Sequence, residues 1–155
     1  MSVITLIEAE AFSRDQKKMN KSVVFTNGCF DLIHAGHLEL LQKAKAEGDI
    51  LMVGLNSDSS VKKLKGDSRP IQSENDRAAI LDSMKPVDCV VIFHEETPLE
   101  LIKQIHPHVL VKGEDYPLEY IVGAEEVSAN GGNVVRIPLV ADCSTQAIIQ
   151  KIKNW

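Results

Sequence analysis

VVFTNGCFDLIHAGH, the stretch from Val23 to His37, decides the fold of this chain. It opens with a short apolar run of the kind that forms a strand buried on both faces. Gly28 then permits a tight turn, and His34 and His37 follow at a spacing that places them on one face of a helix. Free N–H groups and the helix dipole favour anions at such a helix start. The stretch therefore predicts a strand, a turn and a helix that together bind an anion.

The rest of the chain repeats this alternation of apolar runs and helical patterns. Further strands are expected over residues 50–55, 87–93, 109–111 and 134–137, and helices over 58–64, 73–84, 97–105, 118–129 and 144–153. Strands that alternate with helices imply right-handed crossovers and a parallel sheet. We therefore expect an α/β fold, a single Rossmann-like, doubly wound domain with about five parallel strands and helices on both faces. It is expected to span residues 21–155, after a helical extension over residues 1–20.

Composition excludes several classes of protein. A chain of 155 residues suits one domain. Its formal net charge of -5 argues against nucleic acid as a partner, because phosphate-backbone binding needs a basic face. The three cysteines lack C-x-x-C spacing, which favours a reducing compartment over a disulfide framework. No apolar run approaches the ~20 residues of a membrane span, and the N-terminus lacks a signal-peptide layout. We therefore expect a cytoplasmic protein with no membrane partner.

The candidate site lies after the strands, because ligands of doubly wound sheets bind at the carboxyl ends of the strands. After the first strand, Thr26 and Asn27 offer a hydroxyl and an amide, and Gly36 leaves room for a ligand between the two histidines. Two surface histidines on a capped helix are the alternative interpretation. A zinc site is disfavoured, because its would-be ligands cross a strand-to-helix turn without paired spacing. The sequence also lacks a P-loop, a dinucleotide fingerprint and a nucleophile elbow.

Positive charge follows two other expected strands. In the segment VKKLKG, Lys65 beside Gly66 is the best candidate for a phosphate ligand, although a solvated helix face explains such a lysine run equally well. Arg69 and Arg77 could also reach a phosphate, and a helix-surface ion pair is the alternative for Arg77. Lys112 directly follows the fourth strand and is a stronger candidate.

Two motifs resemble the signatures of one family. TNGCFDLIHAGH resembles the G-x-F-D-x-x-H-x-G-H signature of the nucleotidyltransferase superfamily that includes the cytidylyltransferases, and CSTQAII resembles its second signature. The blocks NSDSSVKKLKGDSRPI, ENDRAAIL and VLVKGEDY are similar to the adenylyltransferases of ADP-heptose synthesis. The resemblance covers roughly residues 21–153. It identifies residues 21–155 as a nucleotidyltransferase domain.

This resemblance implies a reaction and a set of site residues. ATP and a sugar 1-phosphate, a D-glycero-D-manno-heptose 1-phosphate in this case, would give ADP-heptose and pyrophosphate for lipopolysaccharide or surface-glycan synthesis. Mg²⁺ would bridge the phosphates through substrate oxygens and water, so no protein ligands for the metal are expected. Catalytic roles are implied for Thr26, His34, His37 and Lys112. Nucleotide binding is implied for Asn27, Gly28, Cys29, Phe30, Gly36, Gly113, Ser144 and Thr145. Substrate binding is implied for Asp31, Asn56, Asp58, Lys65, Arg69 and Arg77.

Alternatives remain open at this point. A cytidylyltransferase acting on glycerol 3-phosphate or another polyol phosphate is one, although the segment VADCST lacks the arginine that many cytidylyltransferases carry there. A nucleotide-binding regulatory module without catalysis is another. Asp31, Ser144 and Thr145 could cap helices instead of binding ligands, or in addition to it. The family resemblance and the N-terminal segment together suggest a homodimer.

Overall fold

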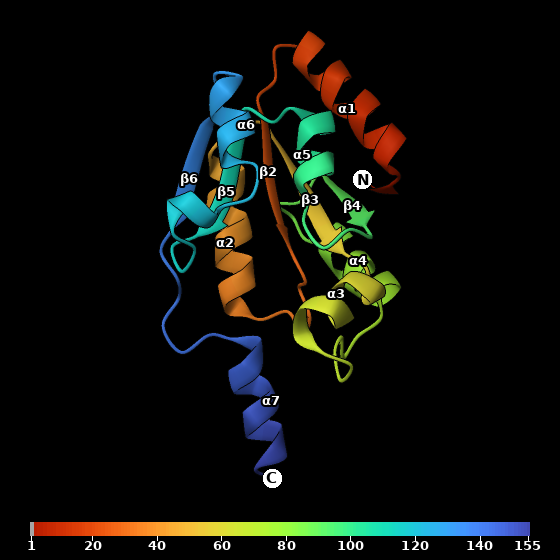
Figure 1. Cartoon of the computed structure of the whole chain (residues 1–155), viewed down its shortest axis with the longest axis vertical. Helices are drawn as coiled ribbons and strands as arrows, with labels where there is room; N and C mark the ends of the chain where they lie inside the picture. Colours follow the sequence, from red (N-terminus) through yellow and green to blue (C-terminus); the bar gives the residue numbers. More distant parts are fainter. Residues whose placement is uncertain (1) are drawn as a thin grey trace.

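The apolar runs form strands because a parallel sheet with helices on both faces covers both sides of each strand. The computed structural model describes residues 2–155 and is shown in Figure 1. The strands are β1 (Ser2–Ile4), β2 (Val23–Gly28), β3 (Ile50–Asn56), β4 (Cys89–Phe93), β5 (Val109–Gly113) and β6 (Asn133–Ile137). They form one six-stranded sheet in the order β1-β4-β3-β2-β5-β6, and every neighbouring pair is parallel. The predicted Rossmann-like fold is confirmed, with one strand more than expected.

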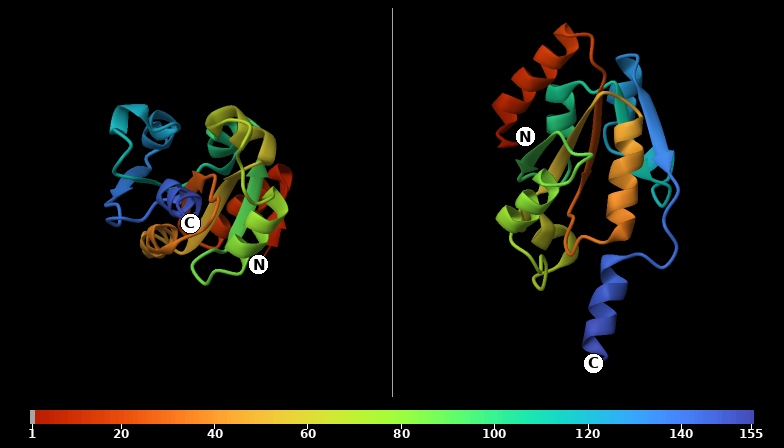
Figure 2. Two further views of the ribbon diagram at one scale, coloured as in Figure 1. Left: turned by 90° about the horizontal axis from the view of Figure 1, so that it is seen from below. Right: turned by 180° about the vertical axis from the view of Figure 1, so that it is seen from behind.

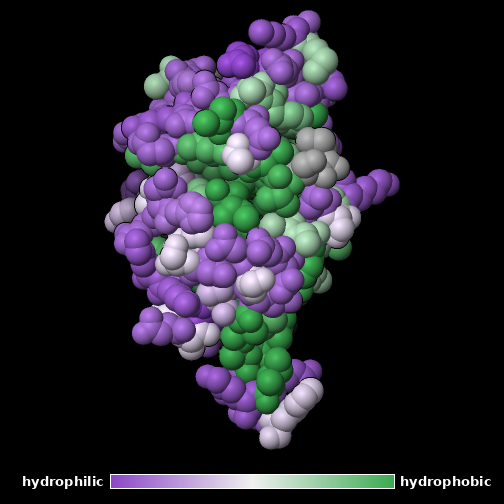
Figure 3. Space-filling model, turned by 90° about the vertical axis from the view of Figure 1, so that its right-hand side faces the viewer, coloured by the Kyte–Doolittle hydropathy of each residue, from purple (hydrophilic) through white to green (hydrophobic). Residues whose placement is uncertain are grey.

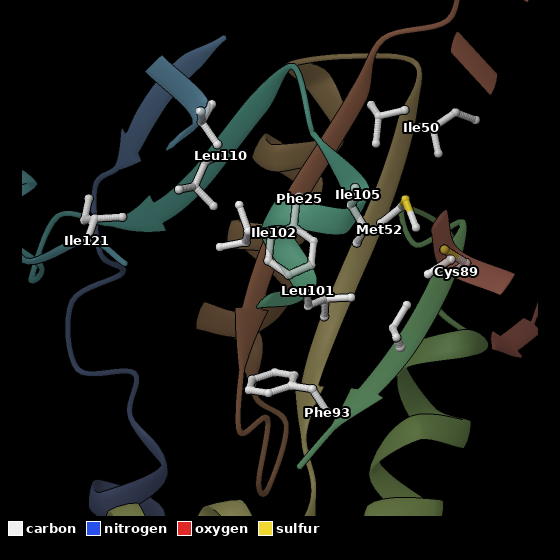
Figure 4. Close-up of a cluster of buried hydrophobic side chains, with 14 residues drawn as sticks. Phe25, Ile50, Met52, Cys89, Phe93, Leu101, Ile102, Ile105, Leu110 and Ile121 are labelled. Atoms are coloured by element: carbon white, nitrogen blue, oxygen red, sulfur yellow. The ribbon is translucent and has the colours of Figure 1, made fainter. Parts of the chain in front are cut away.

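Helices cover both faces of the sheet, as a doubly wound fold requires. Side chains alternate along β2, so that Val23 and Phe25 lie in one core and Val24 in the other. The first core also receives α1 (Leu6–Lys18) and α5 (Leu99–Ile105), and Figure 4 shows Phe25 with side chains of α5. The second core receives α2 (Ala35–Ala46) and α4 (Glu74–Asp82).

The order of the strands places a crevice at one point of the sheet. From β2 the chain proceeds through β3 and β4 in one direction, and β5 and β6 lie on the other side of β2. Neighbouring crossovers that lead to opposite sides leave a gap above the carboxyl ends of β2 and β5, where such sheets bind ligands. The turn after β2 that carries the histidines lies at this switch point.

The N-terminal segment differs from the expected helical extension, because it also contributes β1. Val3 and Ile4 pair in parallel with Val90 and Val91 of β4, and β-branched side chains suit such a half-covered edge strand. Helix α1 then begins at Leu6, after the N-cap residue Thr5, whose side chain forms a capping box with Glu8. The division of the chain into an extension and a domain stays a prediction.

One other expected helix is divided for a local reason. The helix expected over residues 118–129 is split into a 3₁₀ turn, η1 (Leu118–Tyr120), and α6 (Ala124–Ala129), because Gly123 between them has a φ of 88°. Helix α3 (Asp58–Lys65) begins at the expected residue and is capped by Ser57. The carboxylate of Asp58 pairs with Arg77.

The last helix, α7 (Thr145–Lys153), projects beyond the carboxyl ends of the strands, away from the body of the molecule (Figures 1 and 2). None of its residues is buried. Figure 3 shows an apolar patch over this projecting end of the molecule. Within residues 2–155, no helix is both long enough and apolar enough to cross a membrane.

Candidate active site

A cavity of about 770 Å³ lies at the switch point of the sheet. Its walls come from the ends of β2, β3 and β5, the loop after β6, and the first residues of α2 and α7. All of the site residues predicted from the sequence line it, except Asp58 and Arg77. The fold therefore gathers segments far apart in the sequence around one space of the size that suits a nucleotide.

The two histidines form the start of α2. His34 is the N-cap residue, and its Nδ1 accepts the backbone N–H of Gly36 at 3.1 Å. The Nδ1 of His37 accepts the backbone N–H of His34 at 3.2 Å. The rings stack with centroids 3.9 Å apart, and Phe30 packs against His37. Because both Nδ1 atoms accept hydrogen bonds, each neutral imidazole carries its proton on Nε2, where it can be donated to a ligand.

Burial keeps both imidazoles neutral near pH 7. It lowers the pKa of His37 to about 4, with a smaller contribution from His34, and it lowers the pKa of His34 as well. A neutral histidine at a helix start is a hydrogen-bond donor and not a fixed charge. The pair is therefore suited to stabilising an anion that gains charge, rather than to attracting one over a distance.

Acid is expected to destabilise the fold through His37. Because its folded pKa of about 4 lies below the ordinary 6.5, the unfolded state binds more protons between these values. Stability should therefore be lost as pH falls from 6.5 towards 4. Urea unfolding at about pH 5 and about pH 7 should show a smaller loss for His37→Gln than for wild type. The exposed His94, changed to Gln, is the control; an equal loss in all three proteins would contradict the prediction.

Lys112 supplies a partly buried positive charge at the end of β5. Its Nζ donates to the carbonyl oxygen of Asn27 at 3.1 Å and lies 4.6 Å from the centre of the Tyr116 ring. Burial lowers the pKa of Lys112 to about 8, against an opposing effect of Asp115. Burial also raises the pKa of the neighbouring Cys29 thiol, so this cysteine is a neutral lining group and not a nucleophile.

Several predicted ligands are already bonded within the protein. Thr26 is fully buried, and its hydroxyl donates to the carbonyl oxygen of Val111 at 2.8 Å, which leaves its oxygen lone pairs as acceptors. The carboxylate of Asp31 accepts the backbone N–H groups of Ile71 and Gln72 and pairs with Arg69 at 2.8 Å. Burial raises the pKa of Asp31, but these donors outweigh it and hold that pKa below its usual value. Asp31 therefore stays ionised and holds the loop.

Arg77 and Asp58 lie outside the cavity. Arg77 is fully buried, and its guanidinium is used by bonds to protein oxygens, one of them in the carboxylate of Asp58. The substrate contact expected for these two residues is therefore replaced by an internal ion pair. Lys65 and Arg69 do line the cavity. Lys65 is exposed at the end of α3, and its neighbour Gly66 has a φ of 99°.

The start of α7 lies beside the start of α2 and lines the cavity with it. Ser144 caps the helix by accepting the N–H of Ala147 at 3.0 Å, and the Thr145 hydroxyl donates to the carbonyl oxygen of Asp31 at 2.7 Å. Gly36 permits this approach, because a Cβ there would lie 2.9 Å from the His34 ring and 3.1 Å from the Cβ of Cys143. The two helix starts therefore border one space, where their dipoles favour an anion.

An apolar wall of the cavity was missed by sequence reasoning. Its side chains follow β5 and β6 and include Tyr116, Tyr120, Val122, Leu139 and Val140. The segments after these strands were expected to face a ligand, but nothing in their local pattern distinguishes a cavity wall from an exposed loop. Other lining residues to which the sequence assigned no role are Leu40, Leu64, Glu96, Thr97, Pro98 and Gln146, together with Asp115, Pro138 and Cys143 from the segments that follow β5 and β6.

The donors present fit a metal ion held by a ligand better than one held by the protein. In the part of the chain that the structure describes, no three His, Cys, Asp or Glu side chains are grouped closely enough to hold an ion. Of the cavity carboxylates, Asp31 is bonded to the loop, and Glu96 and Asp115 come from separate segments. Mg²⁺ commonly keeps water and phosphate ligands in such sites.

Comparisons with known proteins show which family the chain resembles over most of its length. The profile of the family described as cytidylyltransferase-like matches residues 25–151. The bifunctional protein HldE of Azorhizobium caulinodans is 53% identical over 138 residues, which cover 89% of this chain and 29% of that protein. HldE of Pseudomonas fluorescens is 48% identical over 152 residues, or 98% of this chain and 32% of that protein. The chain thus spans less than one third of the length of these relatives.

Solved structures share the fold. A lipopolysaccharide core biosynthesis protein from Thermoplasma volcanium is 28% identical, with a TM-score of 0.62, and the match covers 77% of this chain and 97% of that chain. A pantothenate synthetase from Thermus thermophilus also has a TM-score of 0.62, at 22% identity, over 90% of this chain and 62% of that chain. The second likeness concerns the fold alone.

Proposed function

This chain belongs to the cytidylyltransferase-like family, and on that premise we propose that it is an adenylyltransferase that transfers AMP from ATP to a sugar 1-phosphate. The single observation that carries the proposal is the stacked pair His34 and His37, whose Nδ1 atoms are occupied and whose Nε2–H groups are free to donate. The pair lines the same cavity as Lys112 and the start of α7.

The reaction is a substitution at the α-phosphorus of ATP. An oxygen of the sugar phosphate forms the new P–O bond, and the bond from the α-phosphorus to the bridging oxygen of the β-phosphate breaks, so that pyrophosphate leaves. The attacking phosphate is largely ionised at neutral pH, its second pKa being about 6. It therefore needs no protein base, which accords with a cavity whose histidines are hydrogen-bond donors.

Catalysis would come from alignment and from stabilising the charge that develops. The Nε2–H groups of His34 and His37 would donate to α-phosphate oxygens as the bond to the leaving group breaks. Lys112 would neutralise a neighbouring phosphate, and Thr26 would help to shape the floor. The N–H groups at the start of α7, with Ser144, would hold the triphosphate, and Mg²⁺ would be bound by substrate oxygens and water.

The acceptor is proposed to be D-glycero-D-manno-heptose 1-phosphate, so that the product is ADP-heptose, a precursor for lipopolysaccharide. Similarity to the bifunctional HldE proteins over most of this chain supports this choice. So does the similarity to a lipopolysaccharide core biosynthesis protein over nearly the whole of that chain. Asn56, Lys65 and Arg69 line the cavity and are the proposed sugar-phosphate ligands.

We further infer a cytoplasmic homodimer. The location rests on the cysteine pattern of the sequence. The dimer rests on the family resemblance, and the projecting end of the chain, with Ile152 of α7 and the terminal Trp155 exposed, offers an apolar surface for a second copy. Light scattering of the full chain should give the mass of two copies, and a monomer mass at micromolar concentration would contradict this part.

A panel of substrates tests the function. Purified protein with Mg²⁺ is incubated with ATP or CTP and with heptose 1-phosphate, glycerol 3-phosphate or another sugar phosphate, and pyrophosphate release is measured. ATP with heptose 1-phosphate should give the highest kcat/KM. A preference for CTP with glycerol 3-phosphate would replace the proposal by a cytidylyltransferase, and ATP binding without pyrophosphate release in any pair would indicate a regulatory module.

A further inference from the structure

Arg77 is a fully buried charge with no direct part in the proposed chemistry. Its guanidinium donates to the carbonyl oxygens of Gln72 at 3.0 Å, Cys29 at 2.7 Å and Asn56 at 2.8 Å. It also donates to the carboxylate of Asp58 at 2.8 Å. A buried charge is tolerated only when its hydrogen bonds are satisfied, and here each guanidinium nitrogen has a partner. Arg77 therefore has a structural task that uses all three of its side-chain nitrogens.

The partners of Arg77 belong to the floor of the cavity. Cys29 lies in the turn between β2 and the histidines, and Asn56 is the last residue of β3. Both line the cavity, and β2 and β3 are paired in parallel. From α4, Arg77 thus fastens the ends of two neighbouring strands from behind the site. Its ion pair with Asp58 adds the start of α3 to the same group.

The turn that Arg77 holds is strained. Phe30 has a φ of 48° and Leu32 a φ of 55°, a region that bulky side chains rarely adopt. Such residues keep this conformation only when the surrounding structure holds them. Residues 69–72, here called the strap, do so in part. The strap binds the carboxylate of Asp31, and the side chain of Gln72 accepts the backbone N–H of Leu32 at 3.2 Å.

Arg77 connects the strap to the turn. One donor of the guanidinium holds the carbonyl oxygen of Gln72 in the strap, and another holds the carbonyl oxygen of Cys29 in the turn. Only a planar fork can reach oxygens in both directions, because a lysine ammonium is a compact point charge on a flexible stem. The turn leads directly into His34, so any displacement at Cys29 is passed on to the imidazoles.

We propose that Arg77 is a positioning residue that holds the strained turn and the strap in the geometry that directs the Nε2–H groups of His34 and His37 into the cavity. The effect of Arg77 on the transfer rate rests on the proposed function, whereas its effect on the orientation of the imidazoles does not. An experiment can therefore refute the positioning role and the proposed function independently of each other.

Histidine NMR of the full chain tests the positioning role without any turnover. In Arg77→Lys, the imidazole ¹H–¹⁵N signals of His34 and His37 should shift or broaden, and the change that added pyrophosphate causes in wild type should be reduced. Arg14→Lys, at an exposed arginine on α1, is the matched control and should leave these signals unchanged. Unaltered His34 and His37 signals in folded Arg77→Lys would overturn the proposal.

Kinetics separates positioning from direct substrate contact. Arg77→Lys should lower kcat by about 10²-fold with little change in the KM for ATP, as misalignment of reacting groups does. A raised KM with unchanged kcat and unchanged histidine signals would indicate a substrate contact and overturn the proposal.

Asp58→Ala covers the case in which Arg77→Lys does not fold. This variant removes only the partly exposed carboxylate partner, and its histidine signals should shift in the same direction by a smaller amount. Histidine signals identical to those of wild type would again overturn the proposal. A wild-type protein that releases no pyrophosphate would refute the proposed function and leave the NMR result standing.

Discussion

Replacing His37 by alanine is expected to lower kcat by about 10²–10³-fold, the usual loss when one donor to a developing oxyanion is removed. The reason is geometric. His37 has its Nδ1 occupied by the backbone N–H of His34, so that its Nε2–H is the group left for an α-phosphate oxygen. Its pKa of about 4, set by burial and by His34, keeps it neutral at working pH, so the loss is that of a hydrogen bond that strengthens in the transition state. The KM for ATP should change much less than kcat.

Two further variants separate this effect from damage to the helix start. His37→Asn keeps a side-chain oxygen near the backbone N–H of His34 but places no donor at the Nε2 position, and it should be nearly as inactive as His37→Ala. His94→Ala removes an exposed histidine outside the cavity and should retain wild-type rates. A His37→Ala protein with wild-type kcat and an unchanged thermal unfolding midpoint would contradict the role of the histidine pair.

Replacing Lys112 by methionine is the second change with a large expected effect, a loss of about 10²–10³-fold in kcat/KM. Methionine keeps most of the length and the apolar stem of the lysine side chain. It removes the charge at the end of β5 that is bonded to the carbonyl oxygen of Asn27. Lys63→Met, at an exposed lysine of α3, is the matched control. The stability of Lys112→Met at neutral pH should equal or exceed that of wild type, because burial disfavours the charged lysine.

The pH profile identifies Lys112 as the source of this effect. Its folded pKa of about 8 means that the ammonium loses its proton as pH rises through 8, and kcat/KM of the wild type should fall over that range. Lys112→Met should lack this alkaline decrease. The stability of the fold should change with pH in the opposite direction to kcat/KM. Between about pH 8 and the ordinary lysine pKa of 10.5, the unfolded state binds more protons than the folded state, so stability rises with pH. An alkaline decrease that persists in Lys112→Met would assign it to another group.

The fold could be predicted from the sequence wherever the pattern of apolar residues within a single segment indicates its secondary structure. The runs that became β2 to β5 are largely apolar, because each is covered on both faces. The edge strand β1 was missed, because so short a segment shows no measurable hydrophobic period. It forms a strand by pairing with β4, which is distant in the sequence. The split of the helix expected over residues 118–129 depends on the backbone of Gly123, whose role as a helix breaker is visible only in the folded chain.

The site was predictable to a similar extent and for similar reasons. The histidine pair follows the end of β2 and Lys112 stands at the end of β5, so topology alone brings them together. Arg77 shows the opposite case. Arg77 lies on a helix with acidic neighbours, which predicts an exposed side chain. Only the packing of the strap against the turn buries its guanidinium, which then bonds to carbonyl oxygens of both segments and not to a phosphate. The wall formed by Tyr116 and Leu139 likewise depends on how loops after two different strands meet.

Tracing the α-phosphorus tests the central claim most directly. The protein is incubated with Mg²⁺, heptose 1-phosphate and ATP labelled with ³²P at the α-position, and in parallel with ATP labelled at the γ-position. All of the α-label that is consumed should appear in a sugar nucleotide, while the γ-label should appear only in pyrophosphate. Transfer of the γ-label to the sugar, or release of the α-label in ADP, would show that the bond to the α-phosphorus is not the one broken and would contradict nucleotidyl transfer at this site.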